Sequence, residues 1–218
     1  MEPDRIKMST LLTATAAIVL LESASDLSVS AASISAMIAT GLTRIIGIGV
    51  LLAITLKLQG QLDVIGLRPS AIGSGTLRGV LWSMSFGVVV AVGLIIGRLA
   101  GINLVGLLQF RLPHKPSDIL ILFVVGSVIA PIAEEVYFRG LVYGYLRRWG
   151  PSAAIIGSTL LFVAAHTGLQ TIPITQIIGG LLFAIAYETE KNLMVPIVIH
   201  MSGNLALFSL VFLYQNLT

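Results

Sequence analysis

Long apolar runs separated by short polar connectors occupy nearly the whole of this 218-residue chain. A helix needs about 20 mostly apolar residues to cross a bilayer. Runs of roughly that length predict seven helices, at residues 8–25, 29–56, 79–99, 118–147, 151–166, 172–188 and 192–214. Two connectors that contain glycine and proline, 62–78 and 101–116, are expected to lie outside the helices. The pattern therefore predicts an all-α polytopic membrane bundle of about seven spans, with limits of six and eight.

The first two predicted spans are less regular than the others. Arg5 and Lys7 precede the first run in the manner of a signal peptide, but the apolar character of the whole chain favours a retained first span. The second run contains Arg44 in its interior. We interpret Arg44 either as a residue that faces a neighbouring helix or as the sign of a helix break near Gly41.

Composition supports the membrane assignment and excludes several classes of function. Hydrophobic residues make up 56% of the chain and charged residues 11%, whereas a soluble domain has roughly 25% charged residues. The absence of cysteine excludes disulfides, thiolate catalysis and cysteine-ligated metals. The net charge of +3 comes from scattered Lys and Arg without a basic, aromatic-rich patch, so no nucleic acid partner is predicted.

The distribution of Lys and Arg predicts the orientation of the bundle. Connectors on the cytoplasmic side of a membrane are enriched in these residues. Eight of them fall on one side of the predicted spans and three on the other: Arg5, Lys7, Lys57, Arg68, Arg78, Arg147, Arg148 and Lys191 against Arg98, Arg111 and Lys115. The N-terminus and the 147–151 turn are therefore predicted to be cytoplasmic.

The most unusual polar feature is the pair Glu134–Glu135 within an apolar run. The stretch 119–138 contains no other charged residue, and an ionised group at the bilayer centre costs roughly 2.5–3.5 kcal/mol. Arg139 lies one helical turn after Glu135, at the spacing of an intrahelical ion pair. Glu134 then projects about 100° around the helix from Glu135. We expect Glu135 to be structural and Glu134 to be reactive.

Three more polar residues are predicted to reach the depth of Glu134. Counted from the 147–151 turn at 1.5 Å per residue, Glu134 lies about 20 Å and His166 about 22 Å along their helices. His200 and Asn204 lie about 12 and 18 Å along the last helix, which starts on the same side. A carboxylate, two imidazoles and an amide at one depth indicate acid–base chemistry.

The helical spacing also predicts which of these side chains share a face. His200 and Asn204 are four residues apart, and so are Phe162 and His166, so that Phe162 is expected to shield His166 from lipid. Each residue alone has an ordinary structural explanation. A buried histidine is more often a core residue than a catalyst. His200 and Asn204 can also be explained as residues that form hydrogen bonds between helices.

Three short motifs in this order resemble those of a known family. Residues 134–139 read Glu-Glu-Val-Tyr-Phe-Arg and match EExxxR, residues 162–166 match FxxxH, and residues 200–204 match HxxxN. The chain thus resembles the CPBP family of intramembrane endopeptidases, which includes type II CAAX prenyl endopeptidases and bacterial bacteriocin-processing or immunity relatives. The resemblance covers about 118–206. It implies a catalytic core at 118–218, preceded by N-terminal transmembrane helices and connectors at 1–117.

The resemblance implies a role for each matching position. Glu134 and His166 would activate a water molecule, and His200 and Asn204 would stabilise the oxyanion. Glu135 and Arg139 would hold the helix arrangement. The implied protein needs no cofactor, opens toward the cytoplasmic leaflet of a bacterial inner (plasma) membrane, and cuts a membrane-bound, including lipidated, peptide or protein.

Two other interpretations stay open at this stage. Glu134, His166 and His200 offer three N/O ligands, the number found in a catalytic zinc site, although the chain has no HExxH motif. Alternatively, the protein is not an enzyme but a scaffold or immunity partner, or a transporter with polar residues at mid-depth. Oligomeric state and substrate do not follow from the sequence.

Overall fold

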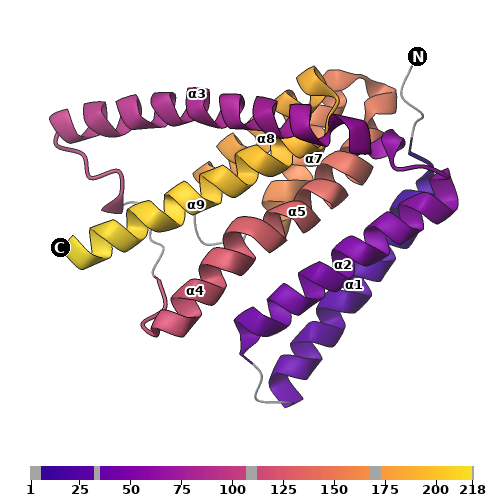
Figure 1. Ribbon diagram of the computed structural model, residues 1–218, viewed down its shortest axis with the longest axis horizontal. Coiled ribbons are helices and arrows are strands. Elements are labelled where there is room, and N and C mark those ends of the chain that lie inside the picture. The colour runs from indigo at the N-terminus through magenta and orange to yellow at the C-terminus, as the bar shows by residue number, and fades with distance from the viewer. Residues whose placement is uncertain (1–5, 32–34, 107–111, 167–172, 218) are drawn as a thin grey trace.

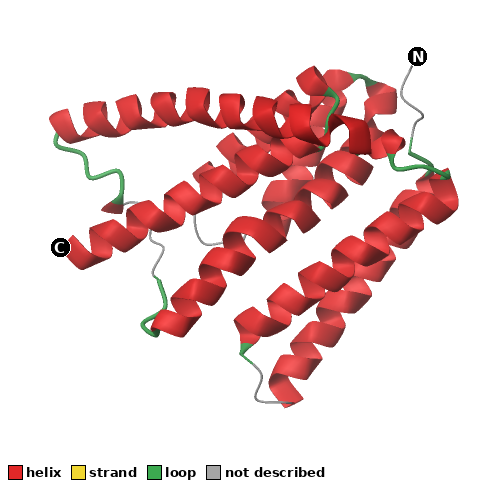
Figure 2. Ribbon diagram, viewed as in Figure 1, coloured by secondary structure: helices red, strands yellow, loops and turns green. Residues whose placement is uncertain are grey.

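The computed structural model describes residues 6–31, 35–106, 112–166 and 173–217, and every regular element among them is helical (Figure 2). The helical segments are α1 (Met8–Ala31), α2 (Ala36–Gln59), α3 (Ile72–Leu99), a central run at 116–149, α7 (Pro151–His166), α8 (Ile174–Glu190) and α9 (Met194–Leu217). Five of the described helical stretches are long and apolar enough to cross a membrane: 8–27, 36–59, 63–99, 116–149 and 194–216. The predicted all-α polytopic fold is confirmed.

Two π-helical segments interrupt the central run, which ends in a 3₁₀ turn. It consists of α4 (Pro116–Val124), the π-helix η4 (Val125–Ile129), α5 (Ala130–Glu135), the π-helix η5 (Val136–Tyr143), α6 (Gly144–Leu146) and the 3₁₀ turn η6 (Arg147–Trp149). Pro131, which has no backbone N–H to donate, is the second residue of α5, close to the end of η4. π-Helical turns inside longer helices occur frequently at functional sites. Here they flank the short helix that holds both glutamates.

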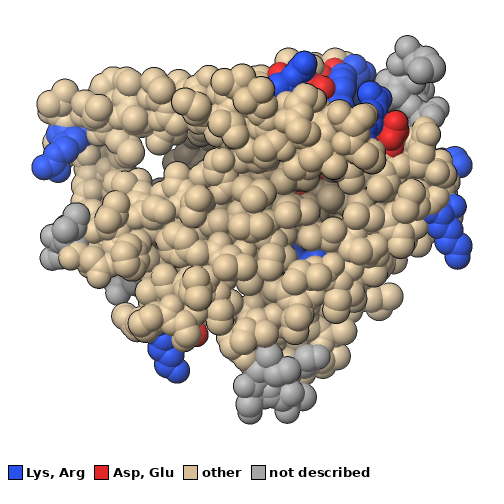
Figure 3. Space-filling view, viewed as in Figure 1, with Lys and Arg blue, Asp and Glu red and all other residues tan. Residues whose placement is uncertain are grey.

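The helices pack around this central run (Figure 1). α3 lies along α9, and α7, α8 and α9 are neighbours in turn. α1 and α2 form a hairpin to one side of the bundle, where α2 contacts α5 and η4 and α1 contacts η5. In Figure 3 the visible Lys and Arg residues lie mainly at helix ends, and the long flanks between them lack charge, as expected for a surface in contact with lipid.

The connector predicted at 62–78 is shorter than expected. It contains two 3₁₀ turns, η1 (Asp63–Ile65) and η2 (Pro69–Ala71), and α3 begins directly afterwards at Ile72. The first turns of α3 are polar and rich in glycine, but Asn192 donates a hydrogen bond to the carbonyl of Ala71 at 2.8 Å. A Cβ at Gly75 would lie only 2.5 Å from the Asn192 side chain. This close packing against Asn192, which only glycine at position 75 permits, explains why α3 begins seven residues before the predicted apolar run at 79.

The second predicted span also needs correction. Residues 29–31 belong to α1, and α2 begins at Ala36 and continues through Gly41 without a break. Arg44 instead faces the neighbouring helix α1, where its guanidinium donates to Glu22 at 2.6 Å. Part of the connector predicted at 101–116 lies outside the described residues.

Candidate active site

Glu135 is the centre of a fully buried polar cluster. Its side chain and that of Arg139 have no solvent-exposed surface, and Arg139 donates to Glu135 Oε1 at 3.0 Å. The Nδ1 atom of His200, on α9, lies 2.8 Å from the same oxygen. Arg139 also donates to the carbonyl of Gly180 on α8 at 3.1 Å. The Glu135–Arg139 pair thus joins the central run to α8 and α9, and the contact with His200 was not predicted from the sequence.

Glu134 faces away from this cluster, toward two imidazoles. Its Oε2 atom lies 3.4 Å from Nε2 of His166 on α7 and 3.8 Å from Nε2 of His200. These are ion-pair distances, longer than a typical N–H···O hydrogen bond. The Glu134 side chain is 13% exposed and that of His166 is 28% exposed. Three of the four residues predicted to converge therefore do so, from three separate helices.

The remaining nitrogen of each imidazole is held by a fixed partner. Nδ1 of His166 lies 2.8 Å from the carbonyl oxygen of Phe162, one turn earlier. Because a carbonyl oxygen only accepts, Nδ1 of His166 must be the donor. Nδ1 of His200 is held in the same way by the Glu135 carboxylate. Both rings consequently direct Nε2 toward Glu134.

Aromatic rings enclose the two histidines. Phe162 lies against His166 with ring centroids 4.4 Å apart and also contacts His200 at 5.8 Å. Phe183, on α8, stacks on His200 at 4.5 Å. The guanidinium of Arg139 lies over both phenyl rings, 4.7 Å from Phe162 and 5.2 Å from Phe183. The apolar contacts fix the orientation of each imidazole and surround the site with groups that exclude water.

Asn204 makes a hydrogen bond that the sequence did not predict. Its amide nitrogen donates to the carbonyl of Gly126 in η4 at 2.8 Å. No hydrogen bond or ion pair among the described residues joins Asn204 to Glu134 or to either histidine. An amide nitrogen carries two hydrogens, so that one of them stays available after the bond to Gly126.

Glu134 and His166 line a cavity of about 550 Å³ between the central run and the α1–α2 hairpin. Thr15 on α1 shares a hydrogen bond of 2.8 Å with the Tyr137 hydroxyl at its edge. Glu22 and Arg44 lie on the hairpin side of the same cavity. Sequence reasoning did not include this hairpin in the site, although the charge of Arg44 within an apolar run was the available signal.

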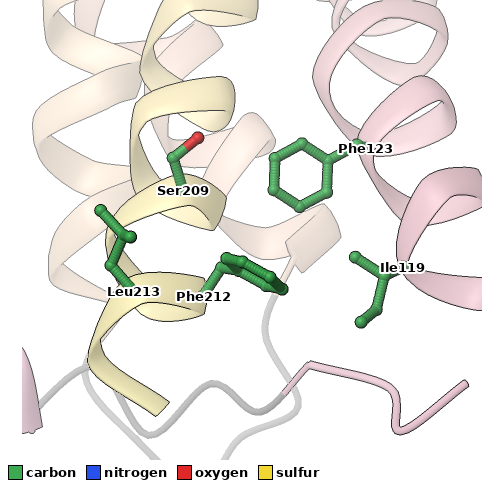
Figure 4. Close-up of a pocket in the computed structure, with 5 residues that line it drawn as sticks. All are labelled: Ile119, Phe123, Ser209, Phe212 and Leu213. Carbon is green, nitrogen blue, oxygen red and sulfur yellow. The ribbon is translucent and has the colours of Figure 1, made fainter. Parts of the chain in front are cut away.

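A second cavity, of about 450 Å³, lies between α4 and α9. Its lining residues are Ile119, Phe123, Ser209, Phe212 and Leu213 (Figure 4). It has no titratable side chain, so it offers no group for acid–base chemistry. We assign the chemistry to the cavity that contains Glu134.

The zinc alternative requires a set of ligands around one point. Within the described ranges, no three His, Cys, Asp or Glu side chains are arranged to hold a metal ion. Glu134, His166 and His200 come closest to such a set, with Glu134 Oε2 3.4 and 3.8 Å from the two Nε2 atoms. These residues do not form a ready metal site as they are placed here.

Comparison with known proteins gives matches that each cover about two fifths of the chain. The membrane-embedded CAAX protease MroQ of Staphylococcus aureus (strain USA300) is 35% identical over 97 residues, which are 41% of this chain and 38% of that protein. An uncharacterized 24.3 kDa protein of Escherichia coli is 28% identical over 91 residues, 39% of this chain and 42% of that protein. The UPF0177 protein YxdF of Lactococcus lactis is 27% identical over 79 residues, 36% of this chain and 44% of that protein.

The similarity thus spans about two fifths of the length of each of these relatives. No solved structure matches the chain. Residues 116–206 match the family model for type II CAAX prenyl endopeptidases, Rce1-like. All three motifs, and every residue of the Glu134 and Glu135 clusters, fall within that segment. Residues 116–206 are therefore similar to the Rce1-like type II CAAX prenyl endopeptidases.

Proposed function

We propose that this protein is an intramembrane endopeptidase that hydrolyses a peptide bond in a membrane-associated, including lipidated, peptide or protein. The observation behind the proposal is the placement of Glu134 Oε2 within 3.4 and 3.8 Å of two imidazole Nε2 atoms at the edge of a cavity. The family match of residues 116–206 supports the same reaction class. The oligomeric state and any protein partner are not part of the proposal.

The protonation of the site favours binding of a water molecule. His166 donates from Nδ1 to a carbonyl, so its neutral ring presents a lone pair at Nε2. Glu134, when ionised, also only accepts hydrogen bonds. We place the water molecule beside these two acceptors, where it donates a hydrogen bond to Glu134 and keeps an oxygen lone pair free. Such a water is positioned to attack a carbonyl carbon.

In the proposed reaction, the water oxygen bonds to the scissile carbonyl carbon while Glu134, assisted by His166, takes one of its protons. The carbonyl oxygen becomes an oxyanion. His200, protonated on both nitrogens and held by Glu135, donates to it from Nε2, and the second amide hydrogen of Asn204 is the other candidate donor. Each such donor is worth about 3–4 kcal/mol in a dry site. The C–N bond then breaks, and Glu134 returns the proton to the leaving amine.

Substitution of Glu134 by glutamine tests this proposal. The variant keeps the shape of the side chain but cannot accept the proton, so we expect loss of cleavage by at least about a hundredfold. The measurement compares membrane proteomes of cells with the natural protein and with E134Q and seeks an uncleaved precursor that accumulates. Once the precursor is identified, its cleavage by the purified natural protein and by purified E134Q is compared directly.

Asp118→Asn is the matched control, because it makes the same chemical change at the exposed start of the same helical run. It should retain cleavage. If E134Q preserves both cleavage and cellular phenotype, the protein acts instead as a scaffold or immunity partner, and the hydrolytic proposal is wrong.

A separate prediction concerns metal. Because we propose that Glu134 and His166 activate water directly, cleavage by the purified protein should not change after incubation with 1,10-phenanthroline. Metal content by mass spectrometry should be well below one zinc per chain. Loss of activity that added zinc restores would support the alternative in which Glu134, His166 and His200 act as zinc ligands.

A further inference from the structure

Glu22 and Arg44 form an ion pair inside the cavity that contains Glu134. Arg44 donates to Glu22 Oε1 at 2.6 Å, and both residues line the cavity of about 550 Å³ together with Glu134 and His166. Glu22 comes from α1 and Arg44 from α2, so both lie outside the family-matched segment 116–206. The proposed chemistry uses neither of them.

This pair differs from the structural pair on the other side of Glu134. Glu135 and Arg139 have side chains with no exposed surface, as is typical of a bond that fixes helices. The side chains of Arg44 and Glu22 are 27% and 39% exposed. The Nε atom of Arg44 is buried and has no partner among the described residues. Arg44 therefore keeps donor capacity beyond its bond to Glu22.

The packing of α2 holds Arg44 close to the reactive groups. One turn earlier, a Cβ at Gly41 would lie 2.8 Å from Val125 in η4, so glycine allows α2 to approach the central run. Arg44 lines the same cavity as Glu134 and His166. An arginine within a membrane span is costly, and the bond to Glu22 leaves the buried Nε atom of Arg44 without a partner among the described residues. A ligand with negative charge would account for its presence.

We propose that Arg44 binds a carboxylate of the peptide substrate, displacing Glu22, and thereby positions the scissile bond against Glu134. A guanidinium matches a carboxylate through two parallel hydrogen bonds. In the free protein, Glu22 accepts the hydrogen bond from Arg44 and neutralises the charge of the guanidinium. The carboxylate is either the free C-terminus of the substrate or an acidic side chain near the cut. This assignment rests on the proposed endopeptidase function.

Binding to the E134Q protein in lipid nanodiscs tests the assignment, because this variant holds a peptide without cleaving it. Three dansylated octapeptides of Ala, Leu and Ser serve as probes: one with a free C-terminus, one amidated, and one amidated with a single internal Glu. We expect at least one carboxylate probe to bind about tenfold more tightly than the uncharged amide. The preferred probe identifies whether the terminus or the side chain supplies the carboxylate.

Adding Arg44→Gln should abolish this preference, and adding Glu22→Gln should strengthen it by removing the competing carboxylate. If R44Q does not fold, the double variant E22Q/R44Q, which removes both charges together, is used in its place. Arg98→Gln, at the far end of α3, is the matched control and should keep the preference. Equal binding of the three probes, binding of none, or a preference that survives R44Q overturns the assignment.

These outcomes are separable from the hydrolytic proposal. The probe experiment measures binding by a protein that does not cleave, so a failed preference leaves cleavage by the natural protein untouched. Conversely, absence of cleavage by the natural protein would reject the endopeptidase function even if Arg44 selects carboxylates.

Discussion

At the scale of single residues, two adjacent glutamates have opposite surroundings. Glu134 lines the cavity and approaches two imidazoles, whereas Glu135 is fully enclosed by Arg139 and His200. The rotation of 100° per residue in a helix separates them. This division followed from the sequence alone. The contact between Glu135 and His200 did not, because 65 positions separate the two residues and no local pattern fixes how distant helices rotate against each other.

The two glutamates should therefore respond differently to the same substitution. Glu135→Gln leaves the buried Arg139 without its counter-charge, and breaking a buried ion pair costs about 3–5 kcal/mol. Glu134→Gln removes a charge at a cavity edge and should cost much less. Thermal unfolding in detergent, followed by tryptophan fluorescence, measures both. A similar loss in the two variants would contradict the distinction between a structural and a reactive carboxylate.

At the scale of secondary-structure elements, the apolar pattern predicted the extent of the central helix but not its internal geometry. A π-helical turn shifts backbone hydrogen bonds by one residue and hardly alters the order of apolar side chains. For that reason the hydrogen bond from Asn204 to the carbonyl of Gly126, inside η4, could not be predicted from the sequence. The early start of α3 was missed for a related reason, since Asn192 supports it from a distant part of the chain.

The end of α8 provides an element-scale prediction through Glu188, which lies outside the five candidate spans. Arg147 in η6 donates two hydrogen bonds to this carboxylate, at 3.0 and 2.9 Å, and Lys191 and Tyr143 also bind it. Partial burial raises the pKa of Glu188, but these partners outweigh burial and lower the pKa to about 2 from 4.5.

Glu188→Gln should accordingly lower the unfolding free energy at pH 7 by about 1 kcal/mol, a modest amount because the group is partly exposed. The folded-state pKa is depressed, so the stabilisation is present above pH 4.5 and is lost as the pH falls toward 2. Unfolding of both proteins in detergent between pH 7 and pH 3 measures the difference. A difference independent of pH would show that the charge of Glu188 is not its cause.

At the scale of the whole molecule, hydropathy alone predicted the helical segments, because apolar length is what a bilayer selects. It did not predict that the α1–α2 hairpin borders the cavity that contains Glu134, since that depends on packing between segments far apart in sequence. The division of the chain at residue 117 and the orientation of the bundle remain predictions.

The natural lack of cysteine makes the orientation directly measurable. Ser117→Cys, at the start of the central run, and Ser152→Cys, in the first turn of α7, place single thiols at exposed positions near opposite ends of that run. With a cytoplasmic N-terminus, a membrane-impermeant maleimide added to intact cells should label S117C and not S152C until the cells are opened. Each variant should retain cleavage. The reverse labelling would invert the bundle in the membrane.

The cavity between the hairpin and the central run has an evolutionary consequence. The side of the cavity that contains Glu134 lies within residues 116–206, which match the family model, and the opposite side lies within the first 60 residues. The sequences of the two sides can therefore change independently in evolution. Under the proposed function, a different hairpin joined to an unchanged family-matched half would change which substrate binds and preserve the reaction. Relatives that align only over that half should accordingly share a chemistry without sharing a target.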